Sequence, residues 1–204
     1  MVQIEDGCVR LADGEEVAAR IIVNATGTGA PELAAGVEIR KRKGHLLITD
    51  RYPGFVRHQL VELGYLKSAH SVSSDSVAFN VQPRRTGQLL IGSSRQYGAE
   101  SSEVESGILM RMLQRAQEYM PALSSLLAIR AWTGFRAATP DKLPLIGPMG
   151  GGTTNFLASG HEGLGITTSL GTARILADHI TGSQPAIPID PYLPSRLAKV
   201  YAHA

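Results

Sequence analysis

The sequence predicts a fold of mixed α/β and α+β character, in which two kinds of sheet share one chain. Residues 21–23, all apolar and β-branched, run directly into a glycine-rich turn, as is typical of a buried strand. Residues 156–159 form a second short apolar run, which a tight glycine turn joins to a helical pattern. Between these runs, longer alternating segments separated by turn residues are typical of antiparallel strands.

Composition and charge exclude several function classes. The chain has 204 residues, 43% of them hydrophobic, and a formal net charge of +2, which is too small for a nucleic-acid-binding surface. Cys8 is the single cysteine, so no internal disulfide can form, and a reducing, cytoplasmic compartment fits best. The six histidines lack the spacing of a metal site, and no apolar run approaches the roughly 20 residues of a membrane span. We therefore expect no metal, no nucleic-acid partner and no membrane span.

The first elements read as a meander that leads into the buried strand. Residues 2–4 and 8–11 flank an Asp-Gly pair, which is a hairpin signal, and Asp13-Gly14 makes a second turn. The run at 21–23 then predicts a strand that is covered on both faces. A glycine-rich turn follows at 27–29, and Pro31 opens a short helical turn.

The middle of the chain predicts a hairpin, a loop and one helix. Strands at 77–81 and 88–92 are joined by a turn at 83–87, and the serine-rich stretch 68–76 reads as a loop. Ser102 and Glu105 fit a capping box at the start of a helix that Pro121 ends. The apolar stripe of this helix predicts core packing and consists of Ile108, Leu109, Met112, Leu113 and Ala116.

The last third predicts a strand at 156–159, a glycine turn at 160–165 and a helix at 166–180 that Gly182 stops. A closing helix is expected from about residue 191 to residue 201.

The basic run at 40–43, at the start of the middle segment, is interpreted as a solvated strand entrance, with phosphate contact as the alternative.

Three motifs could carry chemistry. Small residues at 24–30 follow the buried strand and would allow either close packing or a cofactor contact. The turn at 160–165 opens a helix, whose N–H groups favour an anion or an electron-rich ring edge, although a plain turn would look the same. Arg136 follows an aromatic strand, and it could be a buried ion-pair member or a fork for a substrate carboxylate.

The three motifs together resemble one family. Residues 134–148, which begin Gly-Phe-Arg, and residues 158–166, which read Ala-Ser-Gly-His-Glu-Gly-Leu-Gly-Ile, closely resemble the D-amino-acid oxidase superfamily. Its glycine oxidase, sarcosine oxidase and D-hydroxyproline dehydrogenase branches are nearest. Residues 24–27, Asn-Ala-Thr-Gly, resemble the strand that closes the flavin domain of these proteins, and the order and spacing agree across almost the whole chain.

The resemblance implies the C-terminal portion of an FAD-binding α/β domain, plus a substrate domain with an antiparallel sheet flanked by helices. Residues 1–39 and 139–204 would belong to the flavin domain, and residues 40–138 to the substrate domain. The flavin would be noncovalent, because Cys8 does not sit where sarcosine oxidase attaches its flavin.

The same resemblance implies the site residues. Arg136 matches the carboxylate-binding arginine, His45 lies in the strand entering the substrate domain, and Phe79 or Asn80 matches an aromatic substrate contact. The residues implied to hold the flavin are Ala25, Thr26, Gly27, Gly44, Gly160, His161, Glu162, Gly163, Leu164, Gly165, Ile166 and Thr167. We name no general base and no metal ligand.

The implied activity is FAD-dependent oxidative deamination or dehydrogenation of a small amino acid or secondary amine, of the D-amino acid, glycine, sarcosine or hydroxyproline type. Hydride would pass from the substrate Cα to the flavin. Glycine oxidase has an arginine where this chain has Gly163, and the form of the turn is closer to dehydrogenase and cyanide-synthase-type subunits. Oxidation by O₂ and by another acceptor both stay open.

The chain also lacks a G-x-G-x-x-G fingerprint, since Glu32 stands where its third glycine would fall. We therefore expect a truncated part of an oxidoreductase, which is inactive in isolation and cannot hold FAD tightly alone. The alternative is a non-catalytic fragment or subunit, which folds without FAD and binds a small carboxylate, a partner chain or a second copy of itself.

Overall fold

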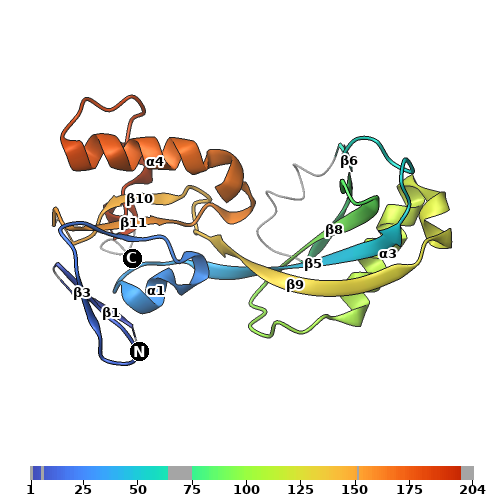
Figure 1. Ribbon diagram of the computed structural model, residues 1–204, viewed down its shortest axis with the longest axis horizontal. Coiled ribbons are helices and arrows are strands. Elements are labelled where there is room, and N and C mark those ends of the chain that lie inside the picture. The colour runs from blue at the N-terminus through green and yellow to red at the C-terminus, as the bar shows by residue number, and fades with distance from the viewer. Residues whose placement is uncertain (1, 6, 64–74, 151, 199–204) are drawn as a thin grey trace. The chain divides into compact units, whose positions relative to one another are not determined.

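The computed structural model describes residues 2–5, 7–63, 75–150 and 152–198, and it divides into two units (Figure 1). Unit 1 comprises Met1–Arg40 and Arg136–Ala204, and unit 2 comprises Lys41–Phe135. Residues 136–138 lie in unit 1, although the sequence assigns them to the middle segment. Ala138 forms a β-bridge with His161, which ties this stretch to unit 1. The predicted mixture of α/β and α+β structure is confirmed.

Unit 1 begins with a small antiparallel meander. Strands β1 (Gln3–Glu5), β2 (Cys8–Arg10) and β3 (Glu16–Ala18) lie side by side in sequence order. The Arg10 guanidinium on β2 donates two hydrogen bonds to the Glu16 carboxylate on β3, at 2.9 and 3.0 Å. The predicted meander is confirmed, although position 6 of its first turn lies outside the described residues.

The second sheet of unit 1 brings together segments that are far apart in the sequence. Its order is β10–β11–β4. Strand β10 (Leu145–Pro148) is antiparallel to β11 (Asn155–Ser159), which is parallel to β4 (Ile22–Asn24). Two of the three strands were predicted, and the parallel pair gives the α/β character of this unit.

Apolar clusters lie on both faces of this sheet. Helix α4 (Gly165–Thr181) covers one face, where the buried residues are Ile146, Phe156, Ile175 and Leu176. The buried residues on the other face are Ala30, Leu145, Leu157 and Leu197. Val23 pairs in register with Phe156 and so shares the α4 face, yet Val23 is 41% exposed. The expectation that 21–23 is covered on both faces is wrong within the described residues, because α4 covers β10 and β11 and leaves Val23 open.

Two turns lead from this sheet into helices, as the sequence predicts. The short helix η1 (Gly27–Gly29) follows β4, and α1 (Ala30–Leu33) carries a proline in its first turn. The short helix η3 (Glu162–Leu164) leads into α4. Gly182 caps α4 in a left-handed conformation with φ +67°, which a glycine adopts without steric cost.

The chain ends less helically than the sequence predicts. Instead of one helix over 191–201, the structure has η4 (Asp190–Tyr192) and α5 (Ser195–Ala198). Pro194 separates them, because the residue before a proline is held in an extended conformation. The last six residues lie outside the described part. None of the helices described here is long and apolar enough to cross a membrane.

Unit 2 is built on a five-stranded sheet of order β6–β7–β8–β5–β9. These strands are β6 (Leu60–Val61), β7 (Ser76–Pro83), β8 (Gln88–Tyr97), β5 (Arg40–Arg51) and β9 (Ala128–Ala138). Strand β7 is antiparallel to β6 and to β8, and β8 is antiparallel to β5. The predicted hairpin of β7 and β8 is confirmed, whereas most of the predicted loop at 68–76 lies outside the described residues.

Helix α3 (Ser106–Tyr119) packs against β7 and β8 on one face of this sheet. The predicted stripe is confirmed, and η2 (Pro121–Ser125) follows the helix where Pro121 was expected to end it. The buried residues of this core are Leu47, Val56, Phe79, Val81, Leu89, Ile91, Met112, Ala116 and Leu123.

The predicted capping box of α3 is wrong. Glu105 is itself the N-cap residue, and no side chain caps the helix. The Glu105 carboxylate instead accepts hydrogen bonds from Lys43 Nζ at 2.8 Å and from Gln96 Nε2 at 2.9 Å. A buried ammonium competes for the carboxylate more strongly than a neutral backbone N–H does.

The interpretation of residues 40–43 as a solvated strand entrance is also wrong for half of the run. The Arg40 side chain is 70% exposed, but Arg42 and Lys43 are completely buried. Lys43 pairs with Glu105, and the Arg42 guanidinium lies 4.4 Å from the centre of the Tyr97 ring. These partners stabilise charges that burial alone would disfavour.

The packing of α3 predicts a contrast between two methionines on one helix. Met112→Ala is expected to lower the free energy of unfolding by about 2–5 kcal/mol, because a fully buried side chain leaves a cavity. Met110 is 56% exposed, so Met110→Ala is expected to cost about 0.5 kcal/mol or less. Urea denaturation followed by circular dichroism measures both losses, and equal losses would contradict this packing.

Candidate functional site

The turn at 160–165 is held against the end of β9. Gly160 has φ +83°, and a Cβ atom there would lie only 2.5 Å from Thr139 Cγ2. Only glycine fits such a conformation and such a close approach. Thr139 is fixed in turn, because its Oγ1 donates a hydrogen bond to the Leu143 carbonyl at 2.8 Å. The bridge between Ala138 and His161 completes this attachment.

His161 joins the turn to helix α4. Its Nε2 lies 2.8 Å from Thr172 Oγ1, and Thr172 is on the buried side of the helix. Burial lowers the pKa of His161, so the ring is neutral at neutral pH. The polar contact of this histidine therefore fastens the turn to the helix that follows it.

Arg136 and the opening of α4 lie together in unit 1. Arg136 Cδ and Nε are 3.9 and 4.0 Å from the point where a Cβ of Gly163 would stand. A methyl group at position 163 would be in ordinary van der Waals contact with the arginine stem. Two motifs that the sequence singled out separately are brought into contact within one unit.

The N-terminus of α4 has no side-chain cap. Its N-cap residue is Leu164, no side chain there forms a capping hydrogen bond, and no acid lies in the first turn. The first N–H groups of a helix have no partner within the helix, and they carry the positive end of its dipole. This end of α4 can therefore accept an anion or an electron-rich edge of a ring beside the Arg136 stem.

The turn after β4 is closed by its own side chains. Asn24 is buried, its Nδ2 donates to the Ala30 carbonyl at 3.2 Å, and its Oδ1 accepts from Thr26 Oγ1 at 2.7 Å. Ser159 Oγ donates to the Gly27 carbonyl at 3.0 Å, which links the turn to β11. Ala25 and Thr26 are exposed on this turn, so it presents small residues at its surface.

His45, in unit 2, is engaged on both ring nitrogens. It is completely buried, its Nδ1 lies 2.9 Å from Ser94 Oγ, and its Nε2 accepts the Glu105 backbone N–H at 3.0 Å. Because Nε2 accepts, the neutral ring carries its proton on Nδ1. The adjacent Gly44 is also buried.

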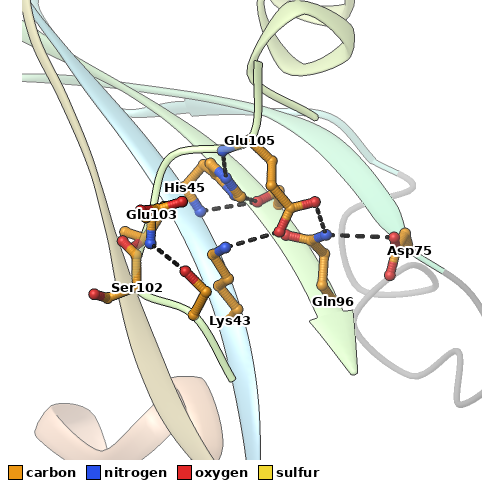
Figure 2. A network of polar contacts seen from close by, with 10 residues as sticks. Lys43, His45, Asp75, Gln96, Ser102, Glu103 and Glu105 are labelled. Carbon is orange, nitrogen blue, oxygen red and sulfur yellow. Dashed lines mark hydrogen bonds and ion pairs between the residues drawn. The ribbon is translucent and has the colours of Figure 1, made fainter. Parts of the chain in front are cut away.

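A network of polar contacts surrounds His45 (Figure 2). Figure 2 shows Lys43 and Gln96 converging on the two oxygens of the Glu105 carboxylate. Gln96 Nε2 also contacts Asp75 Oδ2 at 3.4 Å. The network connects β5, β8 and the start of α3, and it was not predicted from the sequence. The one local feature that indicates it is the alternation of Lys43 and His45, which places both side chains on the same face of β5.

The network sets two pKa values. Burial, followed by the charge of Lys43, lowers the pKa of His45. The hydrogen bond from Lys43, followed by that from Gln96, lowers the pKa of Glu105. The ground state at neutral pH is therefore a neutral imidazole beside a charged ammonium–carboxylate pair.

The two alternatives for an aromatic substrate contact differ in their surroundings. Phe79 is 4% exposed and stacks on Tyr119 with ring centres 4.8 Å apart, inside the core of unit 2. Asn80 is the next residue on β7, so its side chain points to the other face of the sheet. Its Oδ1 accepts a hydrogen bond from Gln59 Nε2 at 3.1 Å.

Comparison with known protein families identifies this arrangement. The model of the DAO family, described as FAD dependent oxidoreductase, matches residues 1–179. The chain belongs to the DAO family. Proteins of this family bind FAD, and the relatives of this chain include glycine oxidases.

Individual relatives cover the chain well and are themselves covered only in part. The hydrogen cyanide synthase subunit HcnC of Pseudomonas protegens is 31% identical over 184 residues, or 87% of this chain and 40% of HcnC. Glycine oxidase of Pseudomonas aeruginosa is 31% identical over 113 residues, or 55% of this chain and 31% of the oxidase. The chain spans less than half the length of these relatives.

The fold of this DAO-family chain is also similar to that of a solved glycine oxidase structure. Glycine oxidase from Geobacillus kaustophilus matches 93% of the chain and 48% of its own length, with a TM-score of 0.76 and 25% identity. In the part of the chain that the structure describes, no group of three or more His, Cys, Asp or Glu side chains is arranged to hold a metal ion.

The contact between Gly160 and Thr139 can be tested by a methyl deletion. Gly160→Ala is expected to destabilise the protein by about 1–3 kcal/mol, because the new Cβ overlaps Thr139 Cγ2 in a left-handed backbone. Thr139→Ser removes that methyl group and is expected to recover about 1 kcal/mol of the loss. Urea unfolding of the single and double variants gives both quantities. An identical cost in the two backgrounds would show that the methyl is not in contact.

The lowered pKa of His45 predicts a loss of stability in mild acid. A histidine whose folded-state pKa lies below its unfolded value of about 6.5 contributes stability that is full above that pH. This contribution is lost as the pH falls through the folded-state pKa. In the wild type, the free energy of unfolding is expected to decrease as the pH falls below about 6.5, and His45→Gln is expected to make this decrease smaller. The control is His58→Gln, at an exposed position of the same unit, which is expected to show the same decrease as the wild type. Urea titrations over a pH series that gave the same slope for His45→Gln and the wild type would refute the network.

Proposed function

We propose that this chain forms part of an enzyme that oxidises a small amino acid or secondary amine, with FAD accepting a hydride from the substrate Cα. The observation that carries the proposal is the position of Arg136 beside the uncapped N-terminus of α4. A guanidinium fork suits a carboxylate, and a helix N-terminus suits a negative charge that develops on a flavin ring. The proposed hydride transfer would use both the Arg136 guanidinium and the N-terminus of α4.

Arg136 would orient the substrate through its carboxylate. Two parallel N–H···O bonds fix both the position and the plane of a carboxylate, which a lysine at this site would not do. Orientation of the reacting carbon is a large part of the catalysis that a hydride transfer needs. We assign no general base, since His161 is engaged by Thr172 and His45 by its own network.

The residues at the turn fit a noncovalent FAD. Gly160, Gly163 and Gly165 have no side chains that would block a ring, and the α4 dipole favours an electron-rich edge. When bound, FAD supplies the two-electron acceptor. The further residues that would hold it are Ala25, Thr26, Gly27, Gly44, His161, Glu162, Leu164, Ile166 and Thr167.

In unit 2, we propose Asn80 rather than Phe79 as the substrate contact, because the Phe79 side chain is buried in the core and stacked on Tyr119. His45 would act as a positioning residue, since it fixes Glu105 and the start of α3 through its ring nitrogens. The single cysteine, Cys8, is consistent with a reducing cytoplasmic location.

A second candidate function is a non-catalytic or incomplete subunit that binds a carboxylate or a partner chain. The observation in its favour is the similarity to HcnC, a relative that is named as a subunit of hydrogen cyanide synthase. The two candidates separate on purification with added FAD. Flavin that stays with the chain through gel filtration supports the enzyme, and a colourless chain that still binds a small carboxylate supports the subunit.

Replacement of Arg136 tests the proposed role directly. In flavin-loaded protein, Arg136→Ala is expected to lower kcat/KM for an amino-acid substrate by about ten-fold or more, because a charge-assisted hydrogen bond is worth about 1.5–3 kcal/mol. Arg136→Lys keeps the charge but loses the fork, so its kcat/KM is expected to lie between those of the wild type and Arg136→Ala. Arg130→Ala is the matched control, since Arg130 is exposed on the same strand.

Steady-state oxidation with an artificial electron acceptor, together with calorimetric titration of a small carboxylate, measures these effects. Unchanged turnover and unchanged carboxylate binding in Arg136→Ala would remove the role of this residue.

A further inference from the structure

Adjacent strands of the sheet in unit 2 carry buried polar atoms that form no hydrogen bond within the described part of the chain. Two of these atoms are the hydroxyl oxygens of Ser76 on β7 and Ser93 on β8. Nε and Nη1 of Arg95, also on β8, are in the same state, although Arg95 has other contacts. Such buried atoms are unfavourable and uncommon in native proteins, and a ligand that supplies acceptors would account for them.

These side chains share the face of the sheet opposite α3. Ser76 and Arg95 are paired directly across the antiparallel strands, so they point to the same side. Ser93 is two residues before Arg95 and points to that side as well. Ser94, which stands between them in the sequence, points to the α3 side and contacts His45, whose ring also binds the start of α3. The polar atoms therefore converge on one face.

The same face carries buried positive charge. Arg95 is 6% exposed, and Arg42 is completely buried. Arg42 is paired with Tyr97, two residues beyond Arg95, so its side chain lies on this face too. The nearby acid Asp75 contacts Gln96 on the α3 side instead. Two guanidinium groups together with two hydroxyls favour an anion on this face.

The donors suit a carboxylate in particular. A carboxylate has two oxygens and a single charge, and both guanidinium N–H groups and hydroxyls donate to it. Hydrogen bonds to a charged group are stronger where water is excluded, as it is around these buried atoms. Ala78 and Gly44, the small residues two positions after Ser76 and Arg42, add no bulky side chain to this face.

We propose that Ser76, Ser93 and Arg95 form an acid-binding site that takes a second carboxylate of the substrate. The substrate class is then amino acids or secondary amines with two carboxylates, because a neutral side chain would leave the buried donors without acceptors. The inference rests on the proposed function, in which Arg136 takes the first carboxylate. It also agrees with the proposed substrate contact Asn80, which is four residues after Ser76 on the same face of β7.

Calorimetric titration of the full chain without flavin tests this site. The probes are glutarate and its monoamide glutaramate, which have the same shape and differ by one charge. Glutarate is expected to bind about ten-fold or more tightly than glutaramate, and Arg95→Gln is expected to weaken glutarate binding by about ten-fold or more. Arg84→Gln is the matched control, because Arg84 is exposed in the turn between β7 and β8, and it is expected to bind like the wild type.

Ser93→Ala keeps the test decisive if Arg95→Gln does not fold. It is expected to weaken glutarate binding by about five-fold or more while the urea midpoint stays at the wild-type value or rises, because the deleted hydroxyl has no hydrogen bond in the free chain. A hydroxyl with a purely structural role would not give this combination.

Three results would overturn the proposal. One is equal binding of glutarate and glutaramate by the wild type. Another is unchanged glutarate affinity in the folded variants, which would mean that bound water alone satisfies the polar atoms. The third is tighter binding of inorganic phosphate than of glutarate, because the site would then suit a different anion.

Turnover of flavin-loaded protein separates this inference from the proposed function. The value of kcat/KM is expected to be about ten-fold or more higher for D-glutamate than for D-glutamine, and Arg95→Gln is expected to lower that ratio. Glutarate binding that depends on Arg95, without flavin retention or turnover, supports the acid-binding site and refutes the proposed function. Turnover of sarcosine or D-glutamine as efficient as that of D-glutamate supports the function and refutes the site.

Discussion

The contact of Gly160 with Thr139 determines how the candidate site is arranged. It allows the backbone before α4 to lie directly against the residues that follow β9, and any side chain at position 160 would push them apart. Arg136 is three residues before Thr139, and Gly163 is three residues after Gly160, so the close approach of one pair brings the other pair together. The His161–Thr172 hydrogen bond then fixes the turn to the helix. A backbone contact thereby sets the position of a charged side chain relative to a helix dipole.

In unit 2, the main constraint is a charged side chain that is buried and needs a partner of opposite charge. Lys43 is completely buried, and an isolated ammonium in that environment would be strongly disfavoured. The Glu105 carboxylate at the start of α3 compensates it, and Gln96 satisfies the second carboxylate oxygen. Because the Glu105 N–H also binds His45, the same residue fixes both the helix start and the imidazole tautomer. The network makes the orientation of α3 depend on polar contacts as well as on the apolar core.

Local patterns in the sequence predict much of this structure, and long-range contacts explain the rest. The glycine turn and helix α4 follow from the spacing of glycines and apolar residues, and both are confirmed. The burial of Lys43 could not be predicted, because its partner lies 62 residues away in the sequence. The same ion pair overrides the local capping signal of Ser102 and Glu105. The choice between Phe79 and Asn80 also needed the structure, since a shift of one residue along a strand exchanges the two faces of the sheet.

The most direct test of the account is a nuclear magnetic resonance titration of the isotope-labelled chain with sarcosine and, separately, with acetate. If Arg136 and the opening of α4 form one anion site, the Arg136 Nε–H signal and the backbone amides of Gly163 and Gly165 shift together and give one dissociation constant. Shifts confined to other parts of the chain, or separate dissociation constants for Arg136 and for the helix start, would contradict a common site.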